Sequence, residues 1–290
     1  MGSRDSRLAI AQAELVIDAI RRRCGLACEL ITMKTTGDRI LDQPLDAIGG
    51  KGLFVKELDD ALRSGRVDIC VHSFKDLPTP DAPDLPVIAV TPREDPRDVL
   101  VFSRNNDPAA PDRSQPIGSS SSRRRLQLAE LFPDWDCLPV RGNIDTRLRK
   151  LDEGRFGALA LAAAGLKRLN LWDRVGRVFS IVEMIPAPCQ GILAIQGRSG
   201  DDLDFLKAID DPDTHDAARA ERAFVATLGG GCTAPTAAHA TTANAALELT
   251  GMYVGADNRV FRGGIKGKRN DAERLGRELA EKLKAGAGNG

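Results

Sequence analysis

The first two thirds of the chain alternate short apolar runs with stretches of helical period. Ala9, Ala13, Val16 and Ile20 recur at the spacing of one helix face and predict a helix over residues 9–23. The same patterns predict helices at residues 53–62, 122–132, 144–153 and 165–169, and strands at residues 30–35, 67–71, 85–90, 99–102, 117–118, 138–140 and 158–161. Such alternation is typical of mostly parallel sheets covered by helices.

Two segments rich in proline or aspartate, 91–97 and 185–188, interrupt this alternation. If the chain leaves a first sheet at one segment and returns at the other, the apolar run 192–195 rejoins that first sheet. We therefore expect two α/β lobes with a hinged cleft between them. Domain 1 would comprise residues 1–92 and 192–210, and domain 2 residues 97–186.

The last third of the chain has a different pattern. It predicts a helix over residues 216–228 that ends at Gly229, because glycine is common just past a helix end. Strands are expected at residues 237–241, 247–254 and 259–265, and a final helix places Leu275, Leu279 and Leu283 on one side. Residues 214–290 should thus form a third domain, a small α+β unit.

Composition narrows the functional classes. The chain has 290 residues, with 41 Lys and Arg against 41 Asp and Glu, so no basic excess favours nucleic acid or an anionic membrane. Two Trp, one Tyr and nine Phe offer few platforms for stacking bases. No apolar run reaches the ~18 residues of a membrane span, and the first residues lack a signal-peptide pattern. We expect a cytoplasmic protein without a nucleic-acid or membrane partner.

Motifs for common cofactors are also missing from the sequence. The six cysteines and three histidines lack the spacing of a zinc site, so we expect no metal. The sequence contains no phosphate-binding loop, dinucleotide fingerprint or serine-nucleophile elbow. The usual nucleotide-binding and hydrolase classes are therefore disfavoured.

The strongest local signal is the segment Ser119-Ser-Ser-Ser-Arg-Arg-Arg125. Its serines can cap a helix, which places Arg123 and Arg124 in a first turn that already carries partial positive charge. A bound anion would explain this arrangement, and a solvated basic patch is the alternative. Other cations lie at the chain start or after predicted strands: Arg4, Arg141, Arg147 and Arg168. Ligands of open α/β sheets bind beyond strand ends, so the pattern favours a small polyanion.

Two further loops also carry charged groups. In the glycine-rich segment 49–52, Lys51 could hold an anion, although many βα turns contain glycine. An apolar strand runs directly into Ser73, Lys75 and Asp76. An aspartate at the carboxyl end of a strand can face cationic charge on a ligand, and a surface ion pair is the alternative interpretation.

Cys232 follows three glycines just past the end of a predicted helix. A helix C-terminus does not lower a thiol pKa, so nearby cations would have to activate this thiol. Cys232 is therefore a nucleophile, an attachment point or an incidental loop residue.

Several segments match one enzyme family in order and over nearly the whole chain. They are Gly2-Ser-Arg-Asp-Ser6, Gly49-Gly-Lys-Gly-Leu-Phe-Val-Lys-Glu57, Asp68-Ile-Cys-Val-His-Ser-Phe-Lys-Asp-Leu-Pro78, Arg93-Glu-Asp-Pro-Arg-Asp98, residues 118–124, Arg141-Gly-Asn143 with Thr146-Arg147, Ala164-Gly-Leu-Lys-Arg168 and Gly230-Gly-Cys232. Together they resemble the hydroxymethylbilane synthase family, also called porphobilinogen deaminase.

The resemblance implies a fold and an activity. The fold would be two lobes like those of type II periplasmic binding proteins plus a small third domain. The activity would be the stepwise deamination and head-to-tail condensation of four porphobilinogen molecules, with release of ammonia and hydroxymethylbilane. The resemblance also implies a dipyrromethane cofactor joined to Cys232 through a thioether, and a monomeric enzyme.

The resemblance assigns roles to individual residues as well. The carboxylate of Asp76 would stabilise the cation left when porphobilinogen loses ammonia. The cofactor-binding residues would be Lys51, Ser73, Lys75, Ser119, Ser121, Arg123, Arg124, Arg147 and Cys232. The substrate-binding residues would be Arg4, Ser6, Phe54, Arg141 and Arg168.

Three features depart from the family pattern. The chain begins inside the first motif, where members usually have an apolar strand. Either the start is misassigned, the sequence is truncated, or the first sheet lacks a strand, which would leave Arg4 and Ser6 poorly held. Pro188-Cys189-Gln190-Gly191 replaces Val-Gly-Gln-Gly and so loses a hinge glycine. Gln196 stands where many members have Glu.

Three alternatives to an active synthase remain open. A two-lobed receptor for small anions shares the cleft and the crossovers but needs neither Asp76 nor Cys232. The sensing module of a regulator would be accompanied by a helix-turn-helix segment. A catalytically impaired homologue would retain the motifs without the activity.

Overall fold

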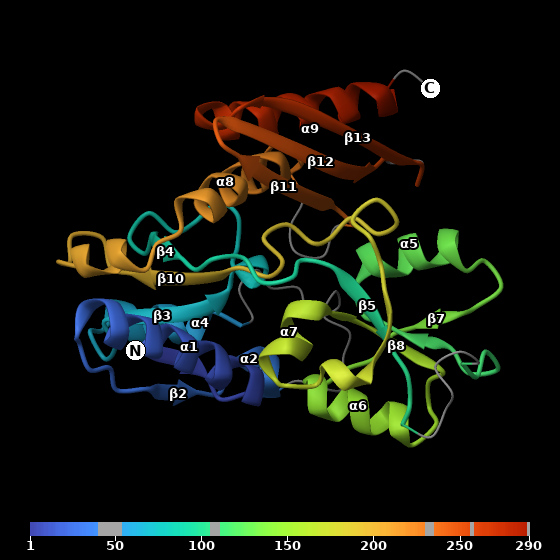
Figure 1. Cartoon of the computed structure of the whole chain (residues 1–290), viewed down its shortest axis with the longest axis horizontal. Coiled ribbons are helices and arrows are strands. Elements are labelled where there is room, and N and C mark those ends of the chain that lie inside the picture. Colours follow the sequence, from blue (N-terminus) through green and yellow to red (C-terminus); the bar gives the residue numbers. More distant parts are fainter. Residues whose placement is uncertain (40–53, 105–110, 230–234, 256–257, 289–290) are drawn as a thin grey trace.

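The computed structural model describes residues 1–39, 54–104, 111–229, 235–255 and 258–288. Its strands form two five-stranded sheets and one three-stranded sheet. In the view of Figure 1, the first sheet with its helices (lobe 1) lies at the lower left and the second (lobe 2) at the lower right. The three-stranded sheet and two long helices form a C-terminal unit above them.

Lobe 1 has the strand order β2-β1-β3-β10-β4. Its strands are β1 (Gly2–Arg4), β2 (Ile31–Met33), β3 (Ile69–Ser73), β4 (Val87–Val90) and β10 (Leu193–Gly197), and its helices are α1 (Arg7–Cys24), α2 (Thr36–Arg39) and α4 (Lys56–Arg63). Strand β1 is parallel to β2 and β3, whereas β10 is antiparallel to β3 and β4. The predicted return of the chain to the first sheet is therefore confirmed.

Lobe 2 repeats this arrangement with the order β7-β6-β8-β5-β9. Its strands are β5 (Asp98–Val101), β6 (Ile117–Gly118), β7 (Cys137–Leu138), β8 (Ala158–Ala162) and β9 (Val175–Val178), and its helices are α5 (Ser122–Leu131), α6 (Ile144–Asp152) and α7 (Ala163–Arg168). Strand β5 is antiparallel to β8 and β9. The fourth strand of each sheet, β10 in lobe 1 and β5 in lobe 2, follows a crossover segment of the chain. The two α/β lobes expected from the sequence are therefore confirmed.

The first strand corrects an expectation from the sequence. Strand β1 lies between β2 and β3, so the sheet of lobe 1 does not lack a strand at this place. The Nε atom of Arg4 donates to Asp38 at 3.1 Å, and its guanidinium lies 4.3 Å from the ring centroid of Phe54. The Ser6 hydroxyl accepts from the amide of Ala9 at 3.3 Å and caps α1. The expectation that Arg4 and Ser6 would be poorly held was wrong, because strand pairing and α1 fix this segment.

The C-terminal unit is a helix pair packed on an antiparallel sheet. It contains α8 (Pro212–Leu228), β11 (Ala237–Ala243), β12 (Ala246–Val254), β13 (Val260–Lys268) and α9 (Ala272–Gly288). Helix α8 begins earlier than predicted, because Asp211 caps it through the amide of Thr214 at 2.8 Å and proline is tolerated in the first turn. The helix ends at Gly229, which has the left-handed φ of 69°. Phe224 and Leu279 lie fully buried in the shared core.

Short 3-10 helices complete the fold: η1 (Phe74–Asp76), η2 (Trp172–Arg174), η3 (Asp204–Ala208) and η4 (Arg269–Asp271). Among the described helices, none has both the length and the apolar character to cross a bilayer.

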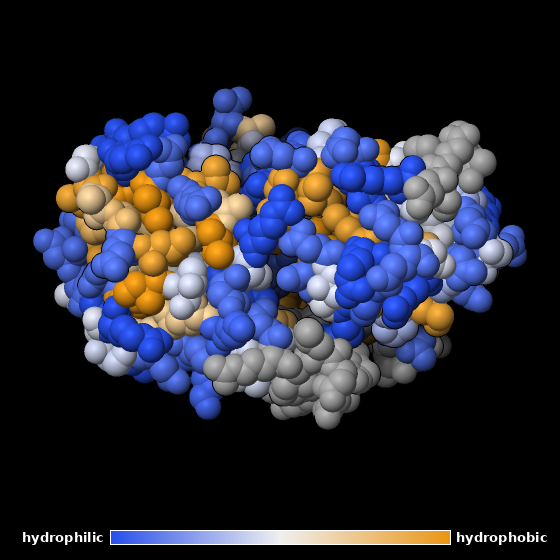
Figure 2. Space-filling model, turned by 90° about the horizontal axis from the view of Figure 1, so that it is seen from below, coloured by the Kyte–Doolittle hydropathy of each residue, from blue (hydrophilic) through white to orange (hydrophobic). Residues whose placement is uncertain are grey.

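Seen from below, the surface is hollowed between the half that holds α1 and the half that holds α6, and hydrophilic residues form most of the visible rim (Figure 2).

Candidate active site

Lys75 and Asp76 lie directly after β3, where Lys75 contacts the second crossover. The apolar residues of β3 are buried, and Phe74 is buried directly after it, so the short helix η1 is anchored while Asp76 is exposed. The ammonium of Lys75 donates to Gln190 Oε1 at 3.2 Å. Burial lowers the pKa of Lys75 to about 8, although the charge of Asp76 opposes this change. The site thus places an exposed carboxylate next in sequence to a cation whose pKa lies below its ordinary value.

Three arginines share this electrostatic neighbourhood. Burial lowers the pKa of Arg147 to about 10, and the charges of Arg124 and Arg141 lower it further, while Asp76 raises it. The Nε atom of Arg147 donates to the Gly142 carbonyl at 2.7 Å. A guanidinium whose pKa is lowered by neighbouring guanidiniums is stabilised by an added anion. Asp76 and Arg124 thus lie within electrostatic reach of both Lys75 and Arg147, and Arg141 lies within reach of Arg147.

The two arginines at the start of α5 already have an internal carboxylate. Arg123 Nη1 lies 2.6 Å from one oxygen of Asp98, and Arg124 Nε lies 2.9 Å from the other. The Ser121 hydroxyl caps the helix by accepting from the Arg124 amide at 3.4 Å, and the Ser119 hydroxyl accepts from the Ser121 amide at 3.3 Å. Two guanidiniums share one carboxylate, so one positive charge remains in excess at this helix end.

The other predicted site residues that the structure describes have partners elsewhere in the two lobes. Ser73 exchanges hydrogen bonds with the amide of Gln12 at 3.0 and 3.1 Å. Arg168 Nη2 donates to the Gly191 carbonyl at 2.6 Å, and burial lowers the pKa of Arg168 to about 10. Arg4 is paired with Asp38. Among the described contacts, none joins Arg4 or Arg168 to Asp76. Lys51 and Cys232 lie outside the described residues.

Sequence reasoning missed two residues of this network. In the sequence, Asp98 is the last residue of the motif 93–98, and Gln190 is part of the changed hinge segment. Gln190 Nε2 donates to Asp98 at 2.9 Å and to the Pro96 carbonyl at 2.7 Å, while its oxygen accepts from Lys75. The signal available in the sequence was a lone aspartate at the start of an otherwise apolar strand, a position where a buried charge needs a partner.

The second crossover contains the changed hinge glycine. Cys189 has a φ of 60°, a conformation that glycine adopts without strain, which explains why the family pattern has glycine here. Cys189 is buried, and its amide donates to Glu221 Oε2 at 2.5 Å. Gly191 has a φ of 90°, and a Cβ there would lie 2.2 Å from the Glu94 carbonyl oxygen. Gln196, the other departure, is buried and donates to the Leu85 carbonyl at 2.8 Å.

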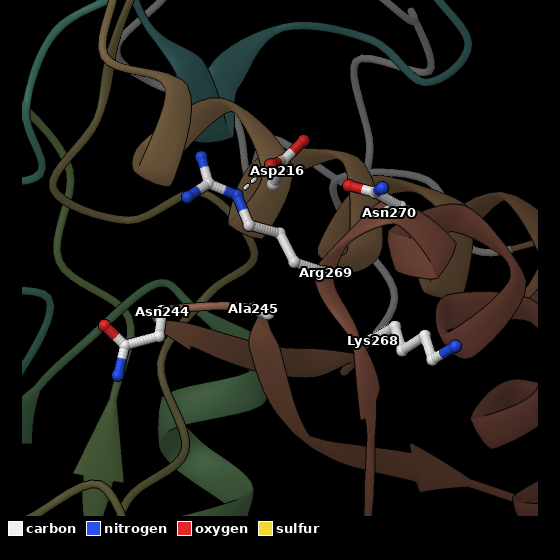
Figure 3. Close-up of a pocket in the computed structure, with 6 residues that line it drawn as sticks. All are labelled: Asp216, Asn244, Ala245, Lys268, Arg269 and Asn270. Atoms are coloured by element: carbon white, nitrogen blue, oxygen red, sulfur yellow. Dashed lines mark hydrogen bonds and ion pairs between the residues drawn. The ribbon is translucent and has the colours of Figure 1, made fainter.

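A separate hollow of about 580 Å³ lies in the C-terminal unit. It is lined by Asp216, Asn244, Ala245, Lys268, Arg269 and Asn270. Figure 3 shows Arg269 turned toward Asp216, with Lys268 and Asn244 extending away from that pair. Its most central cation is thus already paired, and none of its lining residues belongs to the cluster around Asp76.

Comparison with known proteins gives matches along nearly the whole chain. Residues 1–204 match the family model described as "Porphobilinogen deaminase, dipyromethane cofactor binding domain". Residues 216–285 match the model "Porphobilinogen deaminase, C-terminal domain". The porphobilinogen deaminase of Alkaliphilus oremlandii is 51% identical over 285 residues, which cover 98% of this chain and 96% of the relative. That of Ruminiclostridium josui is 51% identical over 287 residues, covering 98% and 97%.

Some solved structures show a weaker likeness to this chain. The periplasmic VFT2 domain of Bordetella pertussis BvgS has a TM-score of 0.39 at 17% identity, covering 69% of this chain and 74% of that domain. Immunogenic lipoprotein A of Vibrio vulnificus has a TM-score of 0.42 at 13% identity, covering 76% and 98%. The assignment rests on the two family models and on relatives that are half identical over almost their full length. By these matches the chain belongs to the porphobilinogen deaminase family.

Proposed function

We propose that this chain is a hydroxymethylbilane synthase. As a transferase, it would deaminate porphobilinogen and join four molecules head to tail, releasing ammonia and the linear hydroxymethylbilane. The observation that carries this proposal is the exposed carboxylate of Asp76 within electrostatic reach of Lys75 and Arg147, with Arg124 and Arg141 close to Arg147. A substrate with two carboxylates that becomes cationic during reaction needs both kinds of charge in one place.

The donor set fits a dipyrromethane, whose acetate and propionate groups are anions. The cluster holds more buried cations than carboxylates, and the Nε atom of Arg123 is buried without a hydrogen-bond partner. The residues proposed to hold the cofactor are Lys51, Ser73, Lys75, Ser119, Ser121, Arg123, Arg124 and Arg147, with attachment at Cys232. When bound, the dipyrromethane supplies the free pyrrole position at which substrate is added.

The protein groups have complementary tasks in this proposal. Asp76 stabilises the cation that porphobilinogen becomes on losing ammonia, and accepts and returns pyrrole protons. The guanidiniums bind carboxylates with two parallel hydrogen bonds, which fixes both charge and orientation. The residues proposed to bind substrate are Arg4, Ser6, Phe54, Arg141 and Arg168.

We also retain the predicted domains 1–92 with 192–210, 97–186 and 214–290, since each range contains one complete sheet. We expect a monomeric, cytoplasmic enzyme whose crossovers let the cleft adapt as the product lengthens. Small-angle scattering on trapped intermediates would follow that adaptation.

The proposal is tested by mass and by turnover. Intact mass after denaturation should exceed the polypeptide mass by two pyrrole units, and Ehrlich's reagent should give a coloured product. Asp76→Ala should abolish conversion of porphobilinogen, Asp76→Glu should retain a fraction of it, and Asp68→Ala, an exposed aspartate of the same lobe, should leave it unchanged. An unmodified polypeptide, or a near-normal rate in Asp76→Ala, would refute the proposal.

A further inference from the structure

We propose that Asp98 is a positioning residue that fixes Arg124 and, through Gln190, Lys75 beside Asp76. This inference rests on the proposed function, because it concerns how the proposed carboxylate-binding groups are held. Asp98 is fully buried at the start of β5, where the chain has just crossed from lobe 1 to lobe 2.

The contacts of Asp98 join four separate segments of the chain. One carboxylate oxygen accepts from Arg123 Nη1 at 2.6 Å. The other accepts from Arg124 Nε at 2.9 Å and from Gln190 Nε2 at 2.9 Å. Gln190 belongs to the returning crossover, and its Oε1 atom accepts from Lys75 of lobe 1 at 3.2 Å. Asp98 therefore connects both crossovers, α5 and the segment that ends in Asp76.

The same contacts set the direction of the Arg124 guanidinium. Besides Asp98, Arg124 donates to the Ala160 carbonyl at 3.1 Å and to Gln190 at 3.4 Å. Without the carboxylate, two buried guanidiniums would face each other with no opposite charge, so both would have to move. Arg124 lies within electrostatic reach of Lys75 and Arg147. Its displacement would thus change the positive field beside Asp76.

Asp98 acts as a fixed charge and does not exchange protons. Burial opposes its ionisation, but Arg123 and Arg124 outweigh burial and hold the pKa of Asp98 well below its ordinary range. The charged groups that face Lys75 are Asp76, Arg124, Asp98 and Arg123. The negative charges of Asp76 and Asp98 both raise the pKa of Lys75. Removing the charge of Asp98 should therefore lower the pKa of Lys75 below about 8.

The test compares Asp98→Asn with the wild-type holoenzyme over a range of pH. We expect kcat to fall roughly 10- to 100-fold, as for other misplaced binding groups, with KM changed less than about twofold. The alkaline limb of the kcat profile should move to lower pH. Gln127→Ala is the matched control, since Gln127 is buried on α5 and binds the backbone of Ile185 and of Arg123 but no charged side chain of the site. It should lower stability without moving the pH profile.

If Asp98→Asn does not fold, the same question is asked in an Arg123→Gln background. There Asp98 and Arg124 remain a neutral pair, and adding Asp98→Asn leaves one buried guanidinium in place of two. We expect a further loss in kcat of about tenfold or more relative to Arg123→Gln alone. An unchanged kcat and pH limb in either comparison would overturn the inference. Failure of wild-type enzyme to convert porphobilinogen would instead overturn the proposed function.

Discussion

The carboxylate of Glu221 offers a direct test of how the C-terminal unit is joined to the lobes. Glu221 lies on α8 and is fully buried. It accepts from Arg93 Nη2 at 2.8 Å, from the Cys189 amide at 2.5 Å and from the Ala240 amide at 2.6 Å. One side chain thus binds the first crossover, the second crossover and β11.

The substitution Glu221→Gln keeps the shape but removes the charge. A glutamine has one acceptor oxygen, so its NH2 group would face at least one of the three donors, and Arg93 would lose its counter-charge where its side chain is only 12% exposed. Breaking a buried ion pair from one side costs about 3–5 kcal/mol. For a chain of 290 residues, whose entropy of unfolding is about 0.6 kcal/mol/K, that corresponds to a Tm roughly 5–8 °C lower.

Scanning calorimetry measures this effect, with Glu273→Gln as the control. Glu273 lies on α9, is 49% exposed and pairs with Arg219 and Arg277 on the surface. Its replacement should cost at most about 1 kcal/mol. Equal changes in Tm for the two variants would show that burial of Glu221 does not hold the unit in place, and the reasoning would fail.

Two further predictions concern pH and the cleft. Burial lowers the pKa of His72 to about 4 from 6.5, so stability should be lost as pH falls from 6.5 toward 4, by up to about 3 kcal/mol. Urea unfolding of His72→Gln should show a flatter profile in this window, and an unchanged slope would contradict it. Arg7 of α1 and Asp145 of α6 join the lobes at 2.8 Å with exposed side chains. At low salt, Arg7→Glu should increase the radius of gyration, and Arg7→Glu with Asp145→Arg should restore it; an increase that persists in 1 M salt would contradict an ionic origin.

The placement of the site was largely predictable from local sequence. The run of apolar residues in β3 ends at Ser73, and the serines before Arg123 cap α5 as expected. Chemistry at the carboxyl ends of such strands follows from the sheet topology alone. The charged groups after these two strands could therefore be proposed before the fold was known, whereas only the family resemblance assigned them to one site.

The partners of these groups could not be predicted in the same way. Asp98 lies 25 residues from Arg123 and 92 residues from Gln190 along the chain. The spacing of apolar residues predicts helices and strands but does not predict contacts between residues so far apart. Strand β1 was missed because three residues that include Ser3 and Arg4 have no apolar period, yet pairing on both sides makes them a strand. Strand β9 was also not predicted, because its two central residues, Gly176 and Arg177, are exposed and give no apolar alternation.

The order of strands in lobe 1 has a consequence for the nascent chain. Strands β3 and β4 are neighbours in sequence but do not pair with each other, since β10 lies between them. On the ribosome, β4 is complete at residue 90, whereas β10 begins at residue 193, after every strand of lobe 2 has been synthesised. The later lobe can therefore close its sheet first. The earlier one waits through about a hundred residues of translation with open strand edges, the state in which a growing polypeptide most needs protection from aggregation.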